Sequence, residues 1–415
     1  MPAAEVIAVL ALLLTTTVAV LPVRVRTEAA TGTAAAGAVL AVGAVDLPTA
    51  LTEVRTLAPV VAFLVVLLVL ADACAALGLF TAVGARLALL GRGSSRRQLA
   101  ATGVAAAGTT ATLSLDATAA LLTPVVTSAA RAQDLEPGPP ALLCARLANS
   151  ASLLLPVSNL TNLLVWPATG LSFVWWTMIV APAWLVAVLA EALLVAGWCH
   201  RGMRSPGRPV RGRALPLPRL PATVLTLVLV GFAAGSALNV APAVVAGVGA
   251  GALVLHAHRV GQVDVRRVVS AAQLGFAWLV LCWGIVVAAV GQTVVGDLRD
   301  RLLPSTVSAT SLVGVALVAT LAASVLNNLP ATLLLLPAVA PLGPLGLLAL
   351  VVGVDVGSNA TIVGSLANLL WRRSLRRDGL GSSAVSFTAF GLATSPALVI
   401  VCTLVLIGWG RLVYR

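Results

Sequence analysis

The stretch that decides the fold runs from Arg146 to Trp166 and reads Arg-Leu-Ala-Asn-Ser-Ala-Ser-Leu-Leu-Leu-Pro-Val-Ser-Asn-Leu-Thr-Asn-Leu-Leu-Val-Trp. It is long and apolar enough to cross a bilayer as a helix. Near its centre lies Pro156, which lacks the backbone N–H that a helix interior needs. We expect the helix to break there, because unwound transporter helices use freed carbonyls and small polar side chains to hold ions and substrate. The alternative is a kinked helix whose polar side chains only bond neighbouring helices.

A second copy of this stretch lies 206 residues further along the chain, where Asn149 aligns with Asp355. Residues 157–164, Val-Ser-Asn-Leu-Thr-Asn-Leu-Leu, then fall on residues 363–370, Val-Gly-Ser-Leu-Ala-Asn-Leu-Leu. Two interrupted polar helices at corresponding places in two hydrophobic halves indicate a transport site near the membrane midplane.

The composition is that of a membrane protein. Hydrophobic residues make up 60% of the chain and charged residues only 10%, whereas soluble domains carry about a quarter charged residues. The net charge of +12 comes from Arg alone, since the chain has no Lys, and in a membrane protein it bears on orientation before nucleic-acid binding. We expect an all-α polytopic protein of the bacterial plasma membrane, with no cleavable signal separate from its first span.

Apolar runs predict five spans in each half of the chain. They lie at about 5–23, 32–45, 56–74, 139–165 and 171–198, and again at about 221–238, 242–256, 270–291, 346–371 and 391–411. Two further apolar segments, 98–130 and 305–340, are interrupted by Ser114-Leu115-Asp116 and by Asn327-Asn328-Leu329-Pro330. We expect each to be a re-entrant hairpin with its polar tip inside the membrane.

Loop charges predict the orientation, because short Arg-rich loops stay in the cytoplasm. The basic loops are 24–26, 91–97, 200–219, 256–267 and 372–377, and the neutral or mixed connections are 46–55, 166–170 and 291–301. With five spans and one hairpin per half, every basic loop falls on one face and the halves are inverted. We therefore expect a first inverted repeat at 1–199, a basic cytoplasmic linker at 200–220 and a second inverted repeat at 221–415.

Four acidic residues lie well inside apolar segments: Asp72, Asp116, Glu191 and Asp355. Each is a functional candidate, because an acid inside a membrane costs several kcal/mol. Asp116 at the first hairpin tip and Asp355 in the second broken helix suit proton or cation coupling, since a carboxylate facing a cavity can load an ion on one side and release it on the other. The alternative is a structural cap on a half-helix. We expect Asp72 and Glu191, nearer span ends, at the interface.

The candidate substrate- and ion-binding residues come from the hairpin tips and broken helices. They are Asp116, Thr118, Asn149, Ser152, Ser158, Asn159, Asn162, Asn327, Asn328, Asp355, Ser358, Asn359, Thr361, Ser365 and Asn368. Asn327 and Asn328 suit a neutral hydroxylated substrate or a small anion met by half-helix N-termini. Two roles are open for Arg146: it binds an anionic substrate, or its side chain snorkels to the cytoplasmic face. We expect the second.

The sequence lacks the local patterns of an enzyme. We find no nucleotide-binding loop, metal-ligand spacing or nucleophile elbow. The five cysteines lie mostly in apolar stretches, so we expect inert core thiols rather than a site for a soft metalloid. These observations predict a secondary transporter that uses no cofactor and hydrolyses no ATP within this chain.

Four motifs resemble the arsenical-pump membrane protein family. They are Leu115–Pro124, Ala148–Leu163, Asn327–Pro330 and Gly353–Trp371. This family is the arsenite efflux branch of the ion transporter superfamily, which also holds citrate and dicarboxylate carriers and some Na⁺/H⁺ antiporters. The resemblance implies an elevator-type carrier, often dimeric, that exports arsenite or antimonite in exchange for protons.

The chain departs from that family's pattern at the site. The family usually has Asn-Asp-Gly where this chain has Leu115-Asp116-Ala117, an Asp at Asn149, and Pro-Lys at Ser358-Asn359. Losing the Asp and the Lys together would keep the net charge of the site while altering its coupling. With Thr361, the Ser358-Asn359 pair is also similar to the Ser-Asn-Thr signatures of Na⁺-coupled carboxylate carriers.

Two functions are therefore expected. The first is proton-coupled efflux of arsenite or antimonite across the plasma membrane, and the second is Na⁺- or H⁺-coupled transport of a small carboxylate or other anion. The expected partners are a small anion or metalloid substrate, the coupling proton or Na⁺, and the lipid bilayer. A homodimer and a soluble ATPase partner are both compatible with the sequence, and no nucleic acid is expected.

Overall fold

The computed structural model describes residues 3–20, 25–204, 207–210, 212, 214–238, 240–304 and 306–413. Within these ranges the chain forms helices joined by turns and loops, and no strand. Seven of the described helical segments are long and apolar enough to cross a membrane. They are 47–76, 173–198, 219–236, 265–291, 309–326, 328–360 and 384–413. The predicted all-α polytopic fold is confirmed.

The helices up to residue 199 alternate long spans with short segments. They are α1 Ala3–Val20, α2 Val25–Ala41, α3 Leu47–Ala76, α4 Leu79–Gly91, α5 Ser95–Thr112, α6 Leu115–Ala117, the π-helical η1 Thr118–Leu122, α7 Thr123–Arg131, α8 Gly138–Ser150, the 3₁₀ segment η2 Ala151–Leu154, α9 Leu160–Thr169 and α10 Phe173–Trp198.

The later helices follow a similar order. They are η3 Gly202–Arg204, α11 Arg219–Leu238, α12 Pro242–Arg259, α13 Val265–Ala271, α14 Leu274–Gly291, α15 Val294–Leu302, α16 Ala309–Leu326, α17 Asn328–Val339, η4 Ala340–Leu342, α18 Gly343–Asp355, η5 Gly357–Ala360, α19 Leu366–Arg377 and α20 Ala384–Val413.

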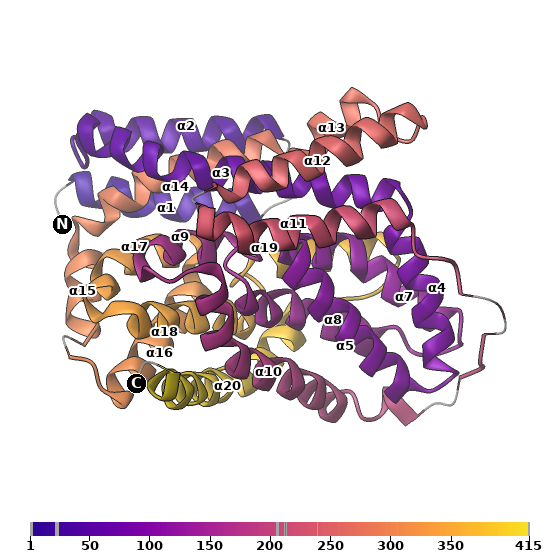
Figure 1. Cartoon of the computed structure of the whole chain (residues 1–415). Helices are drawn as coiled ribbons and strands as arrows, with labels where there is room; N and C mark the ends of the chain where they lie inside the picture. The colour runs from indigo at the N-terminus through magenta and orange to yellow at the C-terminus, as the bar shows by residue number, and fades with distance from the viewer. Residues whose placement is uncertain are drawn as a thin grey trace.

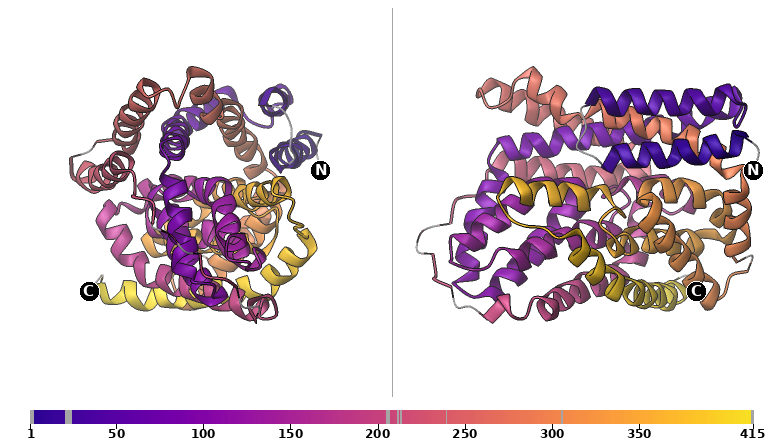
Figure 2. Two further views of the ribbon diagram at one scale, coloured as in Figure 1. Left: turned by 90° about the vertical axis from the view of Figure 1, so that its right-hand side faces the viewer. Right: turned by 180° about the vertical axis from the view of Figure 1, so that it is seen from behind.

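The helices form two layers, as Figure 1 and Figure 2 show. The upper layer of Figure 1 holds α1, α2, α3, α12, α13 and α14, with α11 packed on α12 at its edge. The lower layer holds α4 to α10 and α16 to α20, and α15 runs between α14 and α17. Each layer therefore draws helices from both halves of the sequence.

Two pairs of helices in the lower layer coincide with the two segments predicted to be re-entrant hairpins. In the first, α5 ends at Thr112 and α6 begins at Leu115, and a 2.8 Å hydrogen bond from Gln133 Nε2 to Gln98 Oε1 joins the bases of the two arms. In the second, Asn327 alone separates α16 from α17 and adopts a positive φ of 80°. The tips thus occur where the polar interruptions predict them. Their depth in a bilayer stays a prediction.

Both predicted broken helices are also present. In the first copy α8 passes into η2, the backbone is non-helical from 155 to 159, and α9 then begins at Leu160. In the second copy α18 and η5 are followed by a break before α19 begins at Leu366. The break in the first copy contains Pro156, whose ring nitrogen cannot donate to a helix ladder.

Equivalent side chains of the two copies make equivalent bonds. Asn162 Nδ2 donates to the carbonyl oxygens ten and seven residues before it, at 2.8 and 3.2 Å. Asn368, its counterpart 206 residues later, donates to the carbonyl oxygens ten and seven residues before it, at 3.2 and 3.1 Å. These amides bridge each break, which explains how the freed carbonyls are satisfied inside the protein.

All three predicted neutral or mixed loops are wrong, because most of their residues are helical; residues 166–169 of the 166–170 loop belong to α9. Asp46 accepts a hydrogen bond from the Thr49 backbone N–H at 2.9 Å and caps α3, so most of the 46–55 segment is helix. Thr293 caps α15 in the same manner, so most of the 291–301 segment is helix as well. Polar capping residues start these helices before the hydrophobic runs begin.

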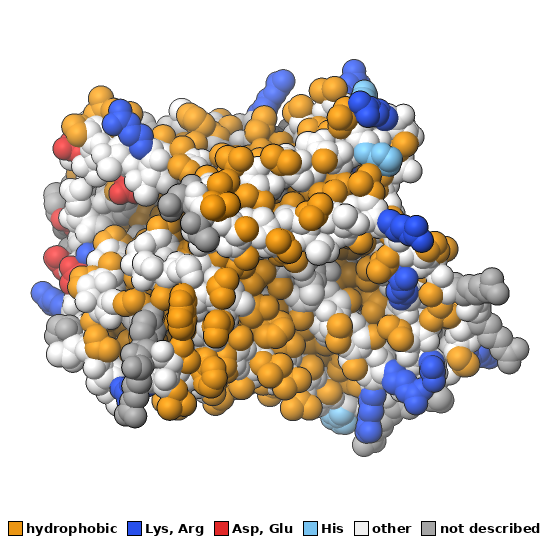
Figure 3. Space-filling view, viewed as in Figure 1, with side chains coloured by type: hydrophobic (Ala, Val, Ile, Leu, Met, Phe, Trp, Pro, Cys, Tyr) orange, Lys and Arg blue, Asp and Glu red, His pale blue; other side chains and the backbone are white. Residues whose placement is uncertain are grey.

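The basic linker packs beside the basic segment at 91–97. In the linker, Gly207 N donates to Gly93 O at 3.0 Å and Arg208 N donates to Gln133 O at 2.7 Å. Figure 3 shows a large group of Arg and His side chains at the right end of one face, whereas the Asp and Glu side chains visible there lie at the left end together with further Arg. Residues 372–377 are helical rather than a loop. Arg24, like Arg211 and Arg213 of the linker, lies outside the described residues.

Candidate functional site

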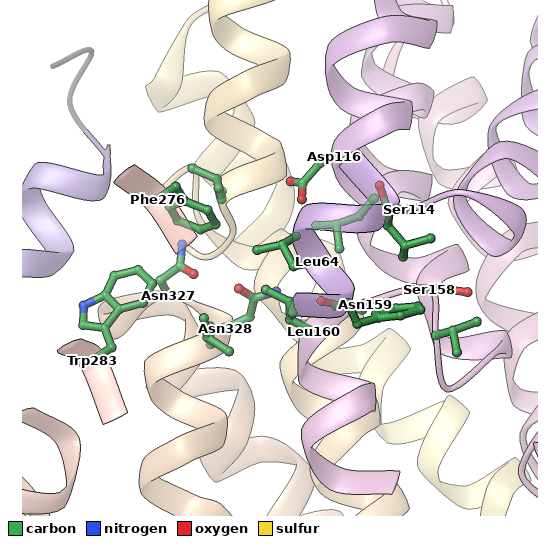
Figure 4. Close-up of a pocket in the computed structure, with 16 residues that line it drawn as sticks. Leu64, Ser114, Asp116, Ser158, Asn159, Leu160, Phe276, Trp283, Asn327 and Asn328 are labelled. Atoms are coloured by element: carbon green, nitrogen blue, oxygen red, sulfur yellow. The ribbon is translucent and has the colours of Figure 1, made fainter. Parts of the chain in front are cut away.

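A small, partly open cavity lies between the two layers. Both hairpin tips and the break of the first broken helix reach it, as does the start of α19 (Figure 4). Its lining residues are Phe63, Leu64, Leu67, Ser114, Leu115, Asp116, Val157, Ser158, Asn159, Leu160, Phe276, Trp283, Asn327, Asn328, Leu329 and Leu366.

The upper layer supplies an apolar wall to this cavity. Phe276 and Trp283 of α14 meet edge to face, with ring centroids 6.3 Å apart. Trp283 Nε1 donates to Thr15 Oγ1 of α1 at 3.1 Å, which fixes the indole from behind. The polar lining groups therefore all come from the lower layer.

Asp116 is the one charged side chain among the described residues that line the cavity. Its Oδ1 atom is buried and has no hydrogen-bond partner in the described part of the chain. Ser114 Oγ, which accepts from the Ala117 backbone N–H at 3.1 Å, caps α6 instead. Asp116 is thus not needed as a cap, and one carboxylate oxygen is left unpaired at the tip.

Helix N-termini converge on the cavity from three elements. Asn159 caps α9 by accepting from Thr161 N at 3.3 Å, and Ser365 caps α19 by accepting from Ala367 N at 3.2 Å. The second hairpin tip contributes Asn328, the first residue of α17. N-terminal N–H groups and helix dipoles stabilise negative charge and oxygen lone pairs.

Asp355 lies directly behind Asn159 and is fully buried. Its Oδ1 accepts from Asn159 Nδ2 at 2.8 Å and from Thr161 Oγ1 at 2.9 Å, and its Oδ2 accepts from Ser152 Oγ at 3.2 Å. All three donors belong to the first broken helix. The carboxylate of the second copy is therefore held by the polar groups of the first, one side chain away from the cavity.

An amide chain joins the two broken helices. Asn149 Nδ2 donates to Asn359 Oδ1 at 2.9 Å and to Asn368 Oδ1 at 2.8 Å. Asn149 Oδ1 is buried without a partner in the described residues. The site thus holds two unpaired acceptor atoms, one at the cavity and one inside this chain.

The structure divides the predicted site residues into two groups. Five line the cavity: Asp116, Ser158, Asn159, Asn327 and Asn328. The others lie in the surrounding protein: Thr118, Asn149, Ser152, Asn162, Asp355, Ser358, Asn359, Thr361, Ser365 and Asn368. Some of these have local partners, as Thr118 has in Thr110 at 2.7 Å and Thr361 has in the Ser324 carbonyl at 2.8 Å.

A family model for citrate transporters matches residues 6–347. The chain belongs to the citrate transporter family. The arsenical pump membrane protein of Escherichia coli is 26% identical over 295 residues, which cover 64% of this chain and 66% of that protein. The protein of the same name from Shigella flexneri is 26% identical over 301 residues, with the same two coverages. The matched region thus spans 66% of these relatives' length.

The fold of this citrate transporter family member also has a solved counterpart. The crystal structure of the YdaH transporter from Alcanivorax borkumensis, described as having an unusual topology, matches with a TM-score of 0.52. The match covers 87% of this chain and 88% of that one at 18% identity, so it bears on fold alone. With the family match and seven apolar helices among the described residues, the protein is a multi-pass protein of the bacterial plasma membrane.

Two departures of this family member from the arsenical-pump pattern contact each other. Asn149 and Asn359 are 210 residues apart in sequence and hydrogen-bond side chain to side chain. At these two positions, where the resemblance implies an acid and a base, the structure has a neutral hydrogen bond of 2.9 Å.

The predictions for Arg146 and Glu191 are wrong. Arg146 does not snorkel, and Glu191 does not lie at an interface: both side chains are 0% exposed and form an ion pair at 2.8 Å inside the lower layer. Packing of α8 against α10 brings the two charges together. The sequence signal that could have found the pair is two opposite charges in neighbouring apolar segments, each expensive to bury alone.

The cysteines lie away from the cavity. Cys74, Cys144, Cys282 and Cys402 are buried, Cys199 is partly buried, and none of the five lines the cavity in the described part of the chain. Cys144 is close to Thr123 Oγ1, at 3.6 Å. Over the described residues, no three His, Cys, Asp or Glu side chains group in a way that could hold a metal ion.

Proposed function

We propose that this family member exports a neutral hydroxylated metalloid, arsenite or antimonite, in exchange for protons. One observation carries the proposal: Asp116, whose buried Oδ1 has no hydrogen-bond partner among the described residues, lines a cavity whose other described polar residues are neutral. Arsenite is an uncharged acid with hydroxyl groups at neutral pH. It offers both donors, which a carboxylate binds, and acceptors, which amides and helix N-termini bind.

The same residues support a mode of recognition. A hydroxyl of the substrate donates to Asp116, and its remaining oxygens accept from Asn327 and Asn328 at the opposite tip (Figure 4). The apolar rings of Phe276 and Trp283 cover the side of the cavity that has no polar group and exclude water there. A small solute with several hydroxyl groups thereby satisfies groups from both hairpins.

Proton coupling follows from competition for Asp116. The ionised carboxylate accepts the substrate hydroxyl on the cytoplasmic side, and a proton that binds the carboxylate on the other side removes this acceptor and releases the substrate. Asp355, held by three donors of the first broken helix, is a second carboxylate that can carry a coupling ion.

The proposed motion moves the lower layer against the upper layer. It is supported by the position of the cavity at the boundary between the layers and by the matching amide bonds of Asn162 and Asn368. The proposal includes the division of the chain into inverted repeats 1–199 and 221–415, joined by the basic cytoplasmic linker 200–220.

A second candidate is Na⁺- or H⁺-coupled transport of a small carboxylate. It is favoured by the match to the citrate transporter model and by the helix N-termini of α9, α17 and α19 at the cavity. A carboxylate would bind these N-termini only when Asp116 is protonated, because two like charges would otherwise meet in one small cavity.

Arsenite flux in everted vesicles tests the choice. An imposed pH gradient, acid inside, should drive arsenite uptake, and an imposed Na⁺ gradient should not. Absence of arsenite flux under both gradients, from protein that elutes as a single folded species, would refute metalloid efflux. Citrate, succinate and malate are then measured under the same gradients, and flux of any of them would support the second candidate.

A further inference from the structure

The buried ion pair between Arg146 and Glu191 lies outside the cavity and is not used by the transport cycle proposed above. The distance from Arg146 Nε to Glu191 Oε2 is 2.8 Å, and both side chains are 0% exposed. Neither residue lines the cavity. A fully desolvated pair is expensive, and in some proteins such a pair is retained because it enforces a specific geometry.

Arg146 uses its guanidinium to join the two halves of the lower layer. Nη1 donates to the Asn359 carbonyl oxygen at 2.7 Å, and Nη2 donates to Thr394 Oγ1 at 3.1 Å and Ser395 Oγ at 3.2 Å. The guanidinium carbon lies 4.9 Å from the centre of the Phe390 ring. Helix α8 of the first half is thereby bound to η5 and α20 of the second.

Glu191 completes the enclosure of Asn359. Glu191 Oε1 accepts from Asn359 Nδ2 at 3.1 Å and from Ser150 Oγ at 2.9 Å. Asn359 Nδ2 also donates to the Arg146 carbonyl oxygen at 2.9 Å. Because these acceptors bind the NH₂ group, the amide can face only one way, and its Oδ1 is presented to Asn149 Nδ2 at 2.9 Å.

We propose that Arg146 and Glu191 are positioning residues that hold η5 through Asn359 and so align the amide chain and the adjacent Asp355 with the first broken helix. Neither residue contacts substrate in this assignment. The inference rests on the proposed function only in taking these groups as part of the transport site. Its geometric content, that the pair orders η5, can be tested without any substrate.

Lysine at position 146 separates geometry from charge. A lysine keeps the positive charge beside Glu191, but its single ammonium group replaces the planar guanidinium. The ammonium cannot reach Glu191, Asn359 and α20 together. The variant R146K should fold, and its apparent KM for transport should rise roughly tenfold with maximal rate changed less than about twofold.

A second variant covers the case in which R146K fails to fold. T394A/S395A removes the two α20 partners of Arg146 and leaves the ion pair in place. It should raise the apparent KM roughly threefold, since the Arg146 guanidinium loses its two hydrogen bonds to α20 and keeps the others. R267K is the matched control, because Arg267 makes a two-pronged ion pair with Asp72 in the upper layer.

Hydrogen exchange of the purified protein gives the readout that needs no substrate. Peptides covering 357–361 should exchange faster in R146K, or in T394A/S395A if R146K does not fold, and should be unchanged in R267K. If wild-type protein transports neither arsenite nor carboxylates, the proposed function fails while this exchange pattern still supports the positioning role. Wild-type exchange at 357–361, or a wild-type KM in a folded variant of an active transporter, would overturn it.

Discussion

Neutralising Asp116 should separate substrate binding from proton coupling. Asp116→Asn keeps the size of the side chain and removes its charge. Asp116 Oδ1 has no partner within the described protein, so the change breaks no internal hydrogen bond at that atom. We therefore expect the variant to fold and to melt within a few degrees of the wild type.

The magnitude follows from the loss of one charge-assisted hydrogen bond. A hydrogen bond to a charged group contributes about 1.5–3 kcal/mol and one between neutral groups about 1 kcal/mol. The difference of about 0.5–2 kcal/mol corresponds to a roughly 2- to 30-fold rise in the KM for arsenite. Coupling should be lost completely, because asparagine cannot exchange a proton with the cavity.

The assay compares two fluxes in the same proteoliposomes. Exchange of labelled for unlabelled arsenite without a gradient should persist in Asp116→Asn with the raised KM, while accumulation driven by a pH gradient should disappear. Asp72→Asn is the control acid, because Asp72 pairs with Arg267 at 2.7 Å in the upper layer, away from the cavity. Accumulation by Asp116→Asn in response to the pH gradient, with a wild-type KM, would refute the reasoning.

Three further changes have distinct readouts. Asp355→Asn neutralises a carboxylate that accepts from three donors, so it should lower the free energy of unfolding by about 1–3 kcal/mol and abolish gradient-driven flux. A lower melting temperature measures the first effect, and unchanged flux would exclude a coupling role. Gly353→Ala should lower the free energy of unfolding by about 1–3 kcal/mol and so reduce the yield of folded protein, because the new methyl group would meet the Ala316 carbonyl oxygen. Gly314 has open space around it, so Gly314→Ala should be tolerated. Asn327→Ala should melt at a lower temperature than Asn327→Gly, since the residue has a φ of 80° and only glycine adopts it without strain; equal melting of the two would contradict a strained tip.

The breaks and tips could be predicted because each has a local cause. Pro156 removes a donor from its own helix, and Asn327 is a polar residue between two short apolar arms. A missing N–H or a turn residue acts within a few positions, so it is readable without knowing what packs nearby. The 206-residue repeat of the polar pattern likewise needs only the sequence, and it led to Asp355, Asn359 and Asn368.

The ends of the helices were less predictable, since hydrophobic runs do not report polar first turns. Helix α3 begins at Leu47, nine residues before the expected span, because Asp46 caps it and Pro48 suits its first turn. The polar turns that follow carry Glu53 and Arg55, which read as loop residues when judged by hydropathy alone.

The sequence by itself thus determined the class of protein, the two broken helices and the two polar tips. Only the tertiary structure decided which polar residues line the cavity and which form hydrogen bonds inside the protein around it. Arg146 and Glu191 show the reason: they lie 45 residues apart, on helices whose packing brings Nε and Oε2 to 2.8 Å. Each charge alone is expected at an interface, and the pair becomes stable inside the protein only because α8, α10, η5 and α20 meet around it.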